Sequence, residues 1–424
     1  MLDEQFFGDS KFHKYLNDNF ISIHAVSGQK MGETLYENYN VMATPTVLLA
    51  NPDGEVVERV IGYSAPPEGF RDRLETAKNT KNSFANLKSA YEKDPNDLKA
   101  AFQLGLKYND YYIRDESKKL FDKVLADPSK SKNIKVRHED EGKDITIYEY
   151  AMFLQSNFDE FVDEFPNSII LREAFLRGGR VHAMARDPEK DTMFYKKMLN
   201  IFPDDFELLQ TYVNFTVRSK TDLKKGMEIS EKIYNSDPST INTKNFAEML
   251  WLNGEKSKLQ QVYGKNFAEK NKDSAQDIYN YATFWVSKKE NLKDALNKAG
   301  MLAKMDSRYL TRTAGLFVDA DDMKGALAIY GPAYLKEIED DASAMYSYAS
   351  FWNRYDKNLE NALTALEISV KMDEKYFKYD ILSQLYEKSG DIEKAIEAEA
   401  KAVEMRPDNP RYAKRLEDLK RKKG

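Results

Sequence analysis

The sequence predicts a small α+β portion at the N-terminal end, followed by a large all-α array of repeated helix pairs. Two apolar, β-like runs within residues 44–63 flank the turn sequence Asn-Pro-Asp-Gly, a pattern typical of a β-hairpin. Beyond residue 83 the strand patterns fade and helical patterns follow one another. There the heptapeptide YNYATFW at 279–285 recurs as YSYASFW at 346–352, an offset of 67 residues. Internal repetition on this scale is typical of helical solenoids.

Length, composition and charge narrow the classes of function. With 424 residues the chain is too long for one ordinary core, so two or three domains or a repeat array are expected. The 70 acidic and 64 basic residues are mixed along the chain and leave a net charge of −6, which gives no reason to expect nucleic acid or an anionic membrane as partner. No apolar run approaches the roughly 20 residues that span a bilayer. The absence of cysteine excludes disulfides and thiolate metal sites.

Residues 1–78 alternate between helical and strand patterns. The turn at 51–54 has a physical basis: Pro52 presets φ, Asp53 can hydrogen-bond its own backbone, and Gly54 accepts a positive φ. The two runs around it are therefore expected to pair as a hairpin. The expected elements are a helix at 10–17, a strand at 20–26, a helix at 31–40, strands at 46–50 and 55–63, and a helix at 66–77.

This order of elements, with Thr-Pro-Thr opening the second strand, resembles the C-terminal part of the thioredoxin family. The resemblance implies that Pro45, preceded by Thr44, occupies the position of the family's cis-proline. The alternative is a trans proline that begins an ordinary strand. The resemblance also implies that the family's Cys-x-x-Cys motif belongs upstream, because Phe7-Gly8-Asp9 resembles the end of the stretch that follows those cysteines.

We therefore expect residues 1–78 to form a partial thioredoxin-like domain that lacks the Cys-x-x-Cys half, and Met1 to be an internal methionine of a longer parent. The strand at 20–26 would then lack its neighbour, which would leave its backbone groups unpaired and make this portion the least protected part of the molecule. Because thiol–disulfide exchange needs a thiolate, the chain as written is expected to have no such activity and to be no enzyme.

The clearest repeat is YDILSQLYEKSGDIEKAIEAEAKAVEMRPDNP at 379–410, which resembles the tetratricopeptide (TPR) consensus. The resemblance implies large residues on the first helix, a glycine at the turn, small residues on the second helix and a terminal proline. Two positions depart from the family, since Ser383 replaces a glycine and Glu399 replaces an aromatic residue. The signature positions that the resemblance implies are Leu104, Gly105, Tyr108, Ala295, Ala326, Ala362, Leu382, Tyr386, Gly390, Ala395, Ala402 and Pro407.

The domain boundaries follow from these two resemblances. TPR-like repeats are expected over 83–410, interrupted by a polar insertion loop at 129–144, and 411–424 should form a C-terminal capping helix with a basic tail. The expected fold class is an α+β, partial thioredoxin-like fold followed by a large all-α TPR-type solenoid.

No pattern predicts a catalytic or metal site. The four histidines, His13, His24, His138 and His182, are scattered, and the HEDEG sequence at 138–142 lacks the alternating ligands of a calcium loop. Phosphate-binding and nucleophile-elbow motifs are absent from the sequence, so no metal and no cofactor are expected. The Tyr-x-Tyr-Ala-x-Phe motif has helical spacing in every copy and is interpreted as repeat core rather than as a base-stacking surface.

Two hypotheses of function remain. In the first, the chain is a protein-interaction scaffold that binds a protein or peptide on a concave repeat surface, with no nucleic acid and no membrane span. In the second, it is a fragment of a periplasmic thiol–disulfide oxidoreductase whose Cys-x-x-Cys lies upstream of Met1. The sequence as written has no signal peptide and indicates a cytoplasmic location, whereas an upstream N-terminus would place the bacterial parent in the periplasm.

Overall fold

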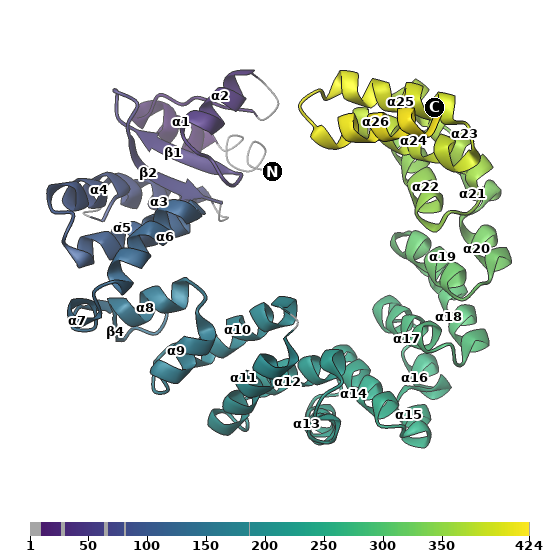
Figure 1. Cartoon of the computed structure of the whole chain (residues 1–424), viewed down its shortest axis with the longest axis horizontal. Helices are drawn as coiled ribbons and strands as arrows, with labels where there is room; N and C mark the ends of the chain where they lie inside the picture. The colour runs from purple at the N-terminus through teal and green to yellow at the C-terminus, as the bar shows by residue number, and fades with distance from the viewer. Residues whose placement is uncertain (1–9, 27–29, 63–66, 80–81, 186, 424) are drawn as a thin grey trace. The chain divides into compact units, whose positions relative to one another are not determined.

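The computed structural model describes residues 10–26, 30–62, 67–79, 82–185 and 187–423 (Figure 1). The motif at 7–9 lies outside these residues. The chain divides into two compact units, 1–211 and 212–424, and the boundary falls within one helix. Both units are dominated by helices, and the two sheets that the described residues form have two strands each.

The first unit contains the α+β portion and the first helix pairs. Its elements are α1 (Ser10–Asn19), α2 (Lys30–Asn38), β1 (Thr46–Ala50), β2 (Val56–Ile61), α3 (Pro67–Asn79), α4 (Phe84–Lys93), α5 (Leu98–Asp110), α6 (Arg114–Leu125), α7 (Pro128–Ser131), β3 (Lys135–Arg137), β4 (Asp144–Thr146), α8 (Ile147–Leu154), α9 (Phe158–Glu164), α10 (Leu171–Ala185), α11 (Pro188–Ile201) and α12 (Phe206–Ser219), which continues into the second unit.

All the regular elements that the structure describes in the second unit are helices. Its elements are α13 (Leu223–Ser236), α14 (Thr240–Leu252), α15 (Lys256–Tyr263), α16 (Lys265–Lys270), α17 (Ala275–Lys288), α18 (Leu292–Met305), the 3-10 helix η2 (Ser307–Tyr309), α19 (Leu310–Asp319), α20 (Met323–Tyr330), α21 (Pro332–Glu337), α22 (Ala342–Tyr355), α23 (Leu359–Met372), α24 (Tyr376–Ser389), α25 (Ile392–Met405) and α26 (Pro410–Lys423).

The predicted hairpin is confirmed as the antiparallel pair β1–β2, in register with Val47 opposite Val60. The side chain that organises its turn differs from the prediction. Asn51 Oδ1 accepts hydrogen bonds from the backbone N–H of Asp53 and of Glu55, whereas the prediction gave this role to Asp53. Gly54 has the expected positive φ of 84°. One face of the hairpin packs on an apolar cluster from α1 and α3.

The strand predicted at 20–26 is wrong. These residues form no strand, and Ile21 and Ile23 are 97% and 72% exposed. Within the described residues β1 pairs only with β2, so the apolar run at 20–26 has no neighbouring strand against which to bury alternate side chains. The Thr44–Pro45 peptide bond is cis, so the trans alternative is also wrong.

The hairpin is fastened to the first helix pair through a buried carboxylate. Glu58 is 3% exposed, and its Oε2 lies 2.7 Å from Lys107 Nζ and accepts a hydrogen bond from the backbone N–H of Phe84. The neighbouring guanidinium of Arg59 lies 5.4 Å from the centre of the Tyr111 ring. These contacts join β2 to α4 and α5. The carboxylate of Glu58 can be buried here because it is paired with Lys107.

The insertion loop predicted at 129–144 also needs correction. The segment begins within α7 and folds into a second hairpin, β3–β4, with Val136 opposite Ile145. Ile145 is buried and His138 packs on the Tyr150 ring at 4.8 Å. Strands of three residues are too short to show a periodic apolar pattern in the sequence.

The helix pairs pack through small residues on their second helices. Ala295, Ala326, Ala362, Ala395 and Ala402 are all fully buried. At such positions a methyl group is the largest side chain that the approach of the neighbouring helices permits. The array of helix pairs predicted after residue 83 is therefore present.

Replacing either Ala362 or Ala395 with leucine should lower the free energy of unfolding by about 1–3 kcal/mol, because the added methylenes overpack a closed contact. Denaturant unfolding measures the change, with Thr364→Leu on an exposed position of α23 as control. Unchanged midpoints for both alanine variants would contradict the assigned register.

A break in two second helices recurs with the 67-residue offset. α15 ends at Tyr263 and α16 starts after Gly264; α20 ends at Tyr330 and α21 starts after Gly331. A Cβ at either glycine would lie within 2.2 Å of a backbone carbonyl oxygen of the preceding turn, so only glycine fits. The tyrosine carbonyl freed by each break accepts a hydrogen bond from a buried indole. The donors are Trp285 Nε1 at 3.0 Å from the Tyr263 oxygen and Trp352 Nε1 at 2.9 Å from the Tyr330 oxygen.

Candidate functional site

The signature positions predicted from the sequence lie in the interior or at turns. Leu104 and Leu382 are buried, and Tyr108 packs its ring against Phe84 at 5.3 Å. A Cβ on Gly105 would meet the Phe121 ring at 2.8 Å, so this glycine permits a close helix approach. The remaining ones have polar or conformational roles: Tyr386 Oη donates to Glu367 at 2.6 Å, Gly390 ends α24 with φ of 90°, and Pro407 lies after α25. These residues stabilise the array, and any binding surface is formed by other residues.

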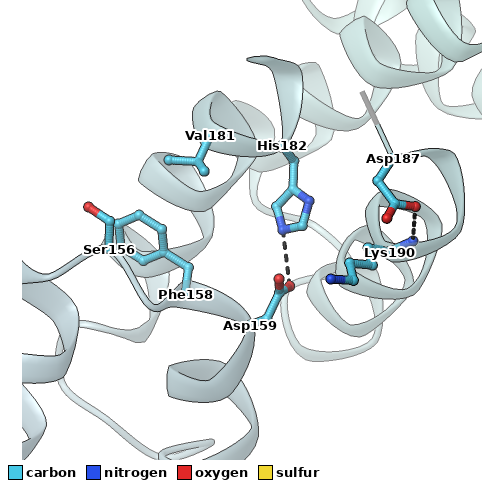
Figure 2. A pocket seen from close by; sticks show the side chains of 7 residues that line it. All are labelled: Ser156, Phe158, Asp159, Val181, His182, Asp187 and Lys190. Carbon is cyan, nitrogen blue, oxygen red and sulfur yellow. Dashed lines mark hydrogen bonds and ion pairs between the residues drawn. The ribbon is translucent and has the colours of Figure 1, made fainter. Parts of the chain in front are cut away.

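Figure 2 shows a pocket of about 310 Å³ in the first unit, between α9, α10 and α11. His182 is its central residue and is 6% exposed. Its Nδ1 lies 2.7 Å from Asp191 Oδ1 and its Nε2 lies 3.0 Å from Asp159 Oδ1. Both ring nitrogens are therefore engaged by carboxylates, and neither is free to act on a substrate.

A second carboxylate of the pocket lining, that of Asp187, is also committed to the fold. Asp187 caps α11 by accepting hydrogen bonds from the backbone N–H groups of Glu189 and Lys190. Within the part of the chain that the structure describes, no group of three or more His, Cys, Asp or Glu side chains could hold a metal ion. The contacts of His182 with Asp159 and Asp191 thus join α9, α10 and α11. Sequence reasoning missed these contacts because residues 159, 182 and 191 come from three separate helices.

The second unit presents a surface built from the first helices of its pairs. In Figure 1, α17, α19 and α22 lie on one side of this unit and α18, α20 and α23 on the other. α17 contacts α19, and α22 contacts α24. Gly315 on α19 lets Tyr355 of α22 approach, since a Cβ there would lie 2.7 Å from the tyrosine hydroxyl. We call the surface formed by α17, η2, α19, α22 and α24 the first-helix face.

Two aromatic pairs recur on the first-helix face. Tyr279 of α17 packs against Tyr309 with ring centres 5.4 Å apart, and Tyr346 of α22 packs against Phe377 of α24 at 5.0 Å. All four side chains are half-buried. Tyr279 and Tyr346 stand at equivalent positions of the 67-residue repeat. Tyr346 and Phe377 join two neighbouring first helices, and Tyr279 meets Tyr309 of η2, directly before α19, so packing of the array fixes both ring pairs.

Arg312 lies over the first of these ring pairs. Its guanidinium is 5.8 Å from the centres of both Tyr279 and Tyr309, and its side chain is exposed. Among the described residues no carboxylate lies within ion-pair distance of it. Gln276 Oε1 accepts a hydrogen bond from Tyr309 Oη at 3.0 Å and holds that ring in place.

Burial changes the titration of an acid and a phenol on the same face. Burial raises the pKa of Asp319 above its usual range. The pKa of Tyr355 is also raised, first by burial and then by the negative charge of Asp319. Neither group neutralises Arg312, so the face offers aromatic surface together with an uncompensated positive charge.

The sequence motif Tyr-x-Tyr-Ala-x-Phe combines two roles that its spacing alone did not separate. Tyr281 and Tyr348, its second tyrosines, are fully buried, as the interpretation as repeat core requires. Tyr279 and Tyr346, its first tyrosines, reach the first-helix face instead. The alternation of 3.6 residues per turn could have indicated this difference, because positions two apart lie on different sides of a helix.

No family model matches the sequence, and no curated protein matches it either. Among solved structures, YrrB, a TPR protein with an unusual peptide-binding site, is 19% identical with a TM-score of 0.27, over 44% of this chain and 97% of YrrB. A tetratricopeptide repeat protein from Parabacteroides merdae is 14% identical with a TM-score of 0.30, over 58% of this chain and 97% of that one. Yeast Tom70 is 11% identical with a TM-score of 0.34, over 84% and 80% of the two chains. Similarity this low assigns no family and transfers no function.

Proposed function

We propose that this chain is a protein-binding scaffold without enzymatic activity of its own, and that its first-helix face holds a polypeptide segment of a partner. The observation that carries the proposal is the presence of two half-buried ring pairs on that face, Tyr279–Tyr309 and Tyr346–Phe377, whose first tyrosines are equivalent in the repeat. Aromatic rings give a large contact area at a small cost in conformational entropy, and tyrosine and arginine dominate the binding energy of protein interfaces. Because packed helices hold these rings, little ordering is needed on binding.

Arg312 gives this face a preference for one kind of polypeptide. A guanidinium binds a carboxylate through two parallel hydrogen bonds, and stacking on aromatic rings holds it in a suitable plane. A segment with an apolar side chain at a ring pair and an acidic side chain or carboxyl terminus at Arg312 matches the chemistry of the face. The approach is steered by charge, so binding should weaken as salt increases.

The finer family assignments belong to this proposal as well. We propose that the helix pairs are of the tetratricopeptide type, which the glycine, alanine and tyrosine positions at 379–410 support. We also propose that residues 1–78 are a thioredoxin-like remnant, which the hairpin β1–β2 packed on α3 supports. The chain has no cysteine to carry thiol exchange, so this remnant would serve binding or packing.

Selection of a random library of peptides of about 12 residues on the full chain tests the proposal, followed by affinity measurements with the selected peptides. Selected peptides should bind with Kd in the micromolar range, about −8 kcal/mol. Tyr279→Ala combined with Tyr346→Ala should weaken them about 10- to 100-fold, because each truncation removes a hot-spot ring. Arg312→Gln should weaken peptides that contain Asp or Glu by about tenfold.

Tyr379→Ala is the matched control for these measurements. Like Phe377, this tyrosine is on α24. Its hydroxyl donates to Glu374 at 3.0 Å, and it belongs to neither ring pair. Its removal should leave peptide binding unchanged. Selected peptides that bind equally well to the Tyr279 and Tyr346 double variant would place the binding surface elsewhere and contradict the proposal.

A further inference from the structure

The last helix, α26, forms several ion pairs with the helix pair that precedes it. Of its side chains only Tyr412 and Leu419 are buried. Its cations instead pair with carboxylates of α24 and α25. The pairs are Arg411 with Asp380, Arg415 Nη2 with Glu387 at 2.6 Å, Arg415 Nε with Glu399 at 3.3 Å, Lys422 with Glu387 at 2.5 Å, and Lys423 with Glu393 at 2.7 Å.

The carboxylates under α26 form an acidic recess, which we define as Asp380 and Glu387 of α24 together with Glu399 of α25. Asp380 is 3% exposed and Glu399 is fully buried. Both residues are placed by the helix pair α24–α25 itself, so the recess is part of the last repeat and is not created by α26. Its carboxyl groups lie where the basic helix α26 packs.

The fit between α26 and the recess is incomplete. Glu399 Oε2 meets Arg415 Nε only as an ion pair at 3.3 Å, and among the described residues neither Glu399 oxygen nor Asp380 Oδ1 accepts a hydrogen bond of good geometry. Buried polar atoms that lack hydrogen bonds offset part of the attraction between the opposite charges. The helix therefore occupies a charged site that it satisfies only in part.

From this arrangement we infer that the acidic recess is a binding site for basic amphipathic helices, which α26 fills from within the same chain and which a partner protein's helix of like chemistry can fill instead. The partner helix would carry two arginines one turn apart, as Arg411 and Arg415 are, and an aromatic residue at the position of Tyr412, whose ring packs on Tyr376. Binding requires α26 to detach, so α26 acts as a tethered competitor. This inference does not depend on the first-helix face.

A labelled synthetic peptide with the sequence of residues 408–424 tests the inference on the full chain. The chain variant Arg411→Gln with Arg415→Gln weakens the binding of α26 to the recess and leaves the recess residues unchanged. The peptide should therefore bind to this variant about tenfold more tightly than to the wild type. Addition of Asp380→Asn and Glu387→Gln to that variant should abolish this gain.

Lys414→Gln with Lys420→Gln is the matched control, because it removes the same charge from exposed positions of α26. It should bind the peptide as weakly as the wild type does. Equal peptide binding by the arginine variant and this control would overturn the inference.

Hydrogen exchange of the wild-type chain guards against misfolding of the variants. Between about 0.05 M and 0.5 M salt, exchange at 410–423 should rise while α24 and the rest of the array keep their protection, because screening weakens the ion pairs. If α26 stays as protected as α24 at high salt, then it is a fixed part of the repeat and the recess is not an exchangeable site.

Discussion

Glu399→Gln should make the chain more stable than the wild type at pH 8, by about 3 kcal/mol. The pKa of Glu399 is raised to about 7, first by burial and then by the negative charge of Asp380, while Ser383 and Arg415 lower it. The folded chain therefore binds this proton more tightly than the unfolded chain does. The stabilisation is complete below about pH 4.5 and is lost as the pH rises through about 7.

Glutamine cannot ionise, so the variant should keep its stability across this pH range. Unfolding by denaturant at pH 5 and at pH 8, with hydrogen exchange at α24–α26 to locate the change, measures the difference. Glu393→Gln is the control, since Glu393 is exposed and pairs with Lys423 at the surface. A Glu399→Gln chain that loses as much stability between pH 5 and pH 8 as the wild type would show that Glu399 is not the group that titrates.

Trp352→Phe should lower the free energy of unfolding by about 3 kcal/mol. The substitution leaves the Tyr330 carbonyl oxygen at the helix break without its indole donor, which costs about 1–3 kcal/mol for a buried group, and the smaller ring adds a cavity. Trp285→Phe should have the same effect, because its indole meets the Tyr263 oxygen in the same way. The two changes should add in the double variant, since distant sites act independently.

Trp251→Phe controls for the loss of an indole as such. Trp251 is half-buried and its ring lies near the ammonium groups of Lys256 and Lys288, away from any helix break. Its replacement should cost less than 1 kcal/mol. If thermal or denaturant unfolding gives equal losses for all three tryptophan variants, then the hydrogen bond at the break contributes nothing of its own.

The array could be predicted from the sequence because its packing rules are local. The alanines of the second helices and the 67-residue offset marked the helix pairs, and Asn-Pro-Asp-Gly marked the hairpin. The apolar pattern at 20–26 predicted a strand wrongly. A strand forms only beside a second strand, and the local sequence pattern does not say whether such a neighbour exists. The hairpin at 135–146 was missed because its strands are short and its one central apolar pair, Val136 and Ile145, leaves no periodic pattern in the sequence.

The candidate site could be predicted only in part. Tyr279 and Tyr346 belong to the repeated motif, but their ring partners Tyr309 and Phe377 come from η2 and α24 and have no shared motif. Glu399 was visible as a departure from the TPR pattern. Its ion-pair partner, Arg415, belongs to α26, which the sequence of one repeat does not include.

The glycine breaks at 264 and 331 set the natural unit of growth for this array. At each Tyr-Gly break, the tyrosine carbonyl oxygen accepts a hydrogen bond from a tryptophan 22 residues later. We call the break and its tryptophan a junction, and each junction includes parts of two helix pairs. Gain or loss of a 67-residue block during evolution leaves every junction with both of its parts. Gain or loss of a single helix pair separates a break from its tryptophan. The length of such an array is therefore expected to change in steps of two helix pairs, and descendants with an odd number should have lost the break together with its indole.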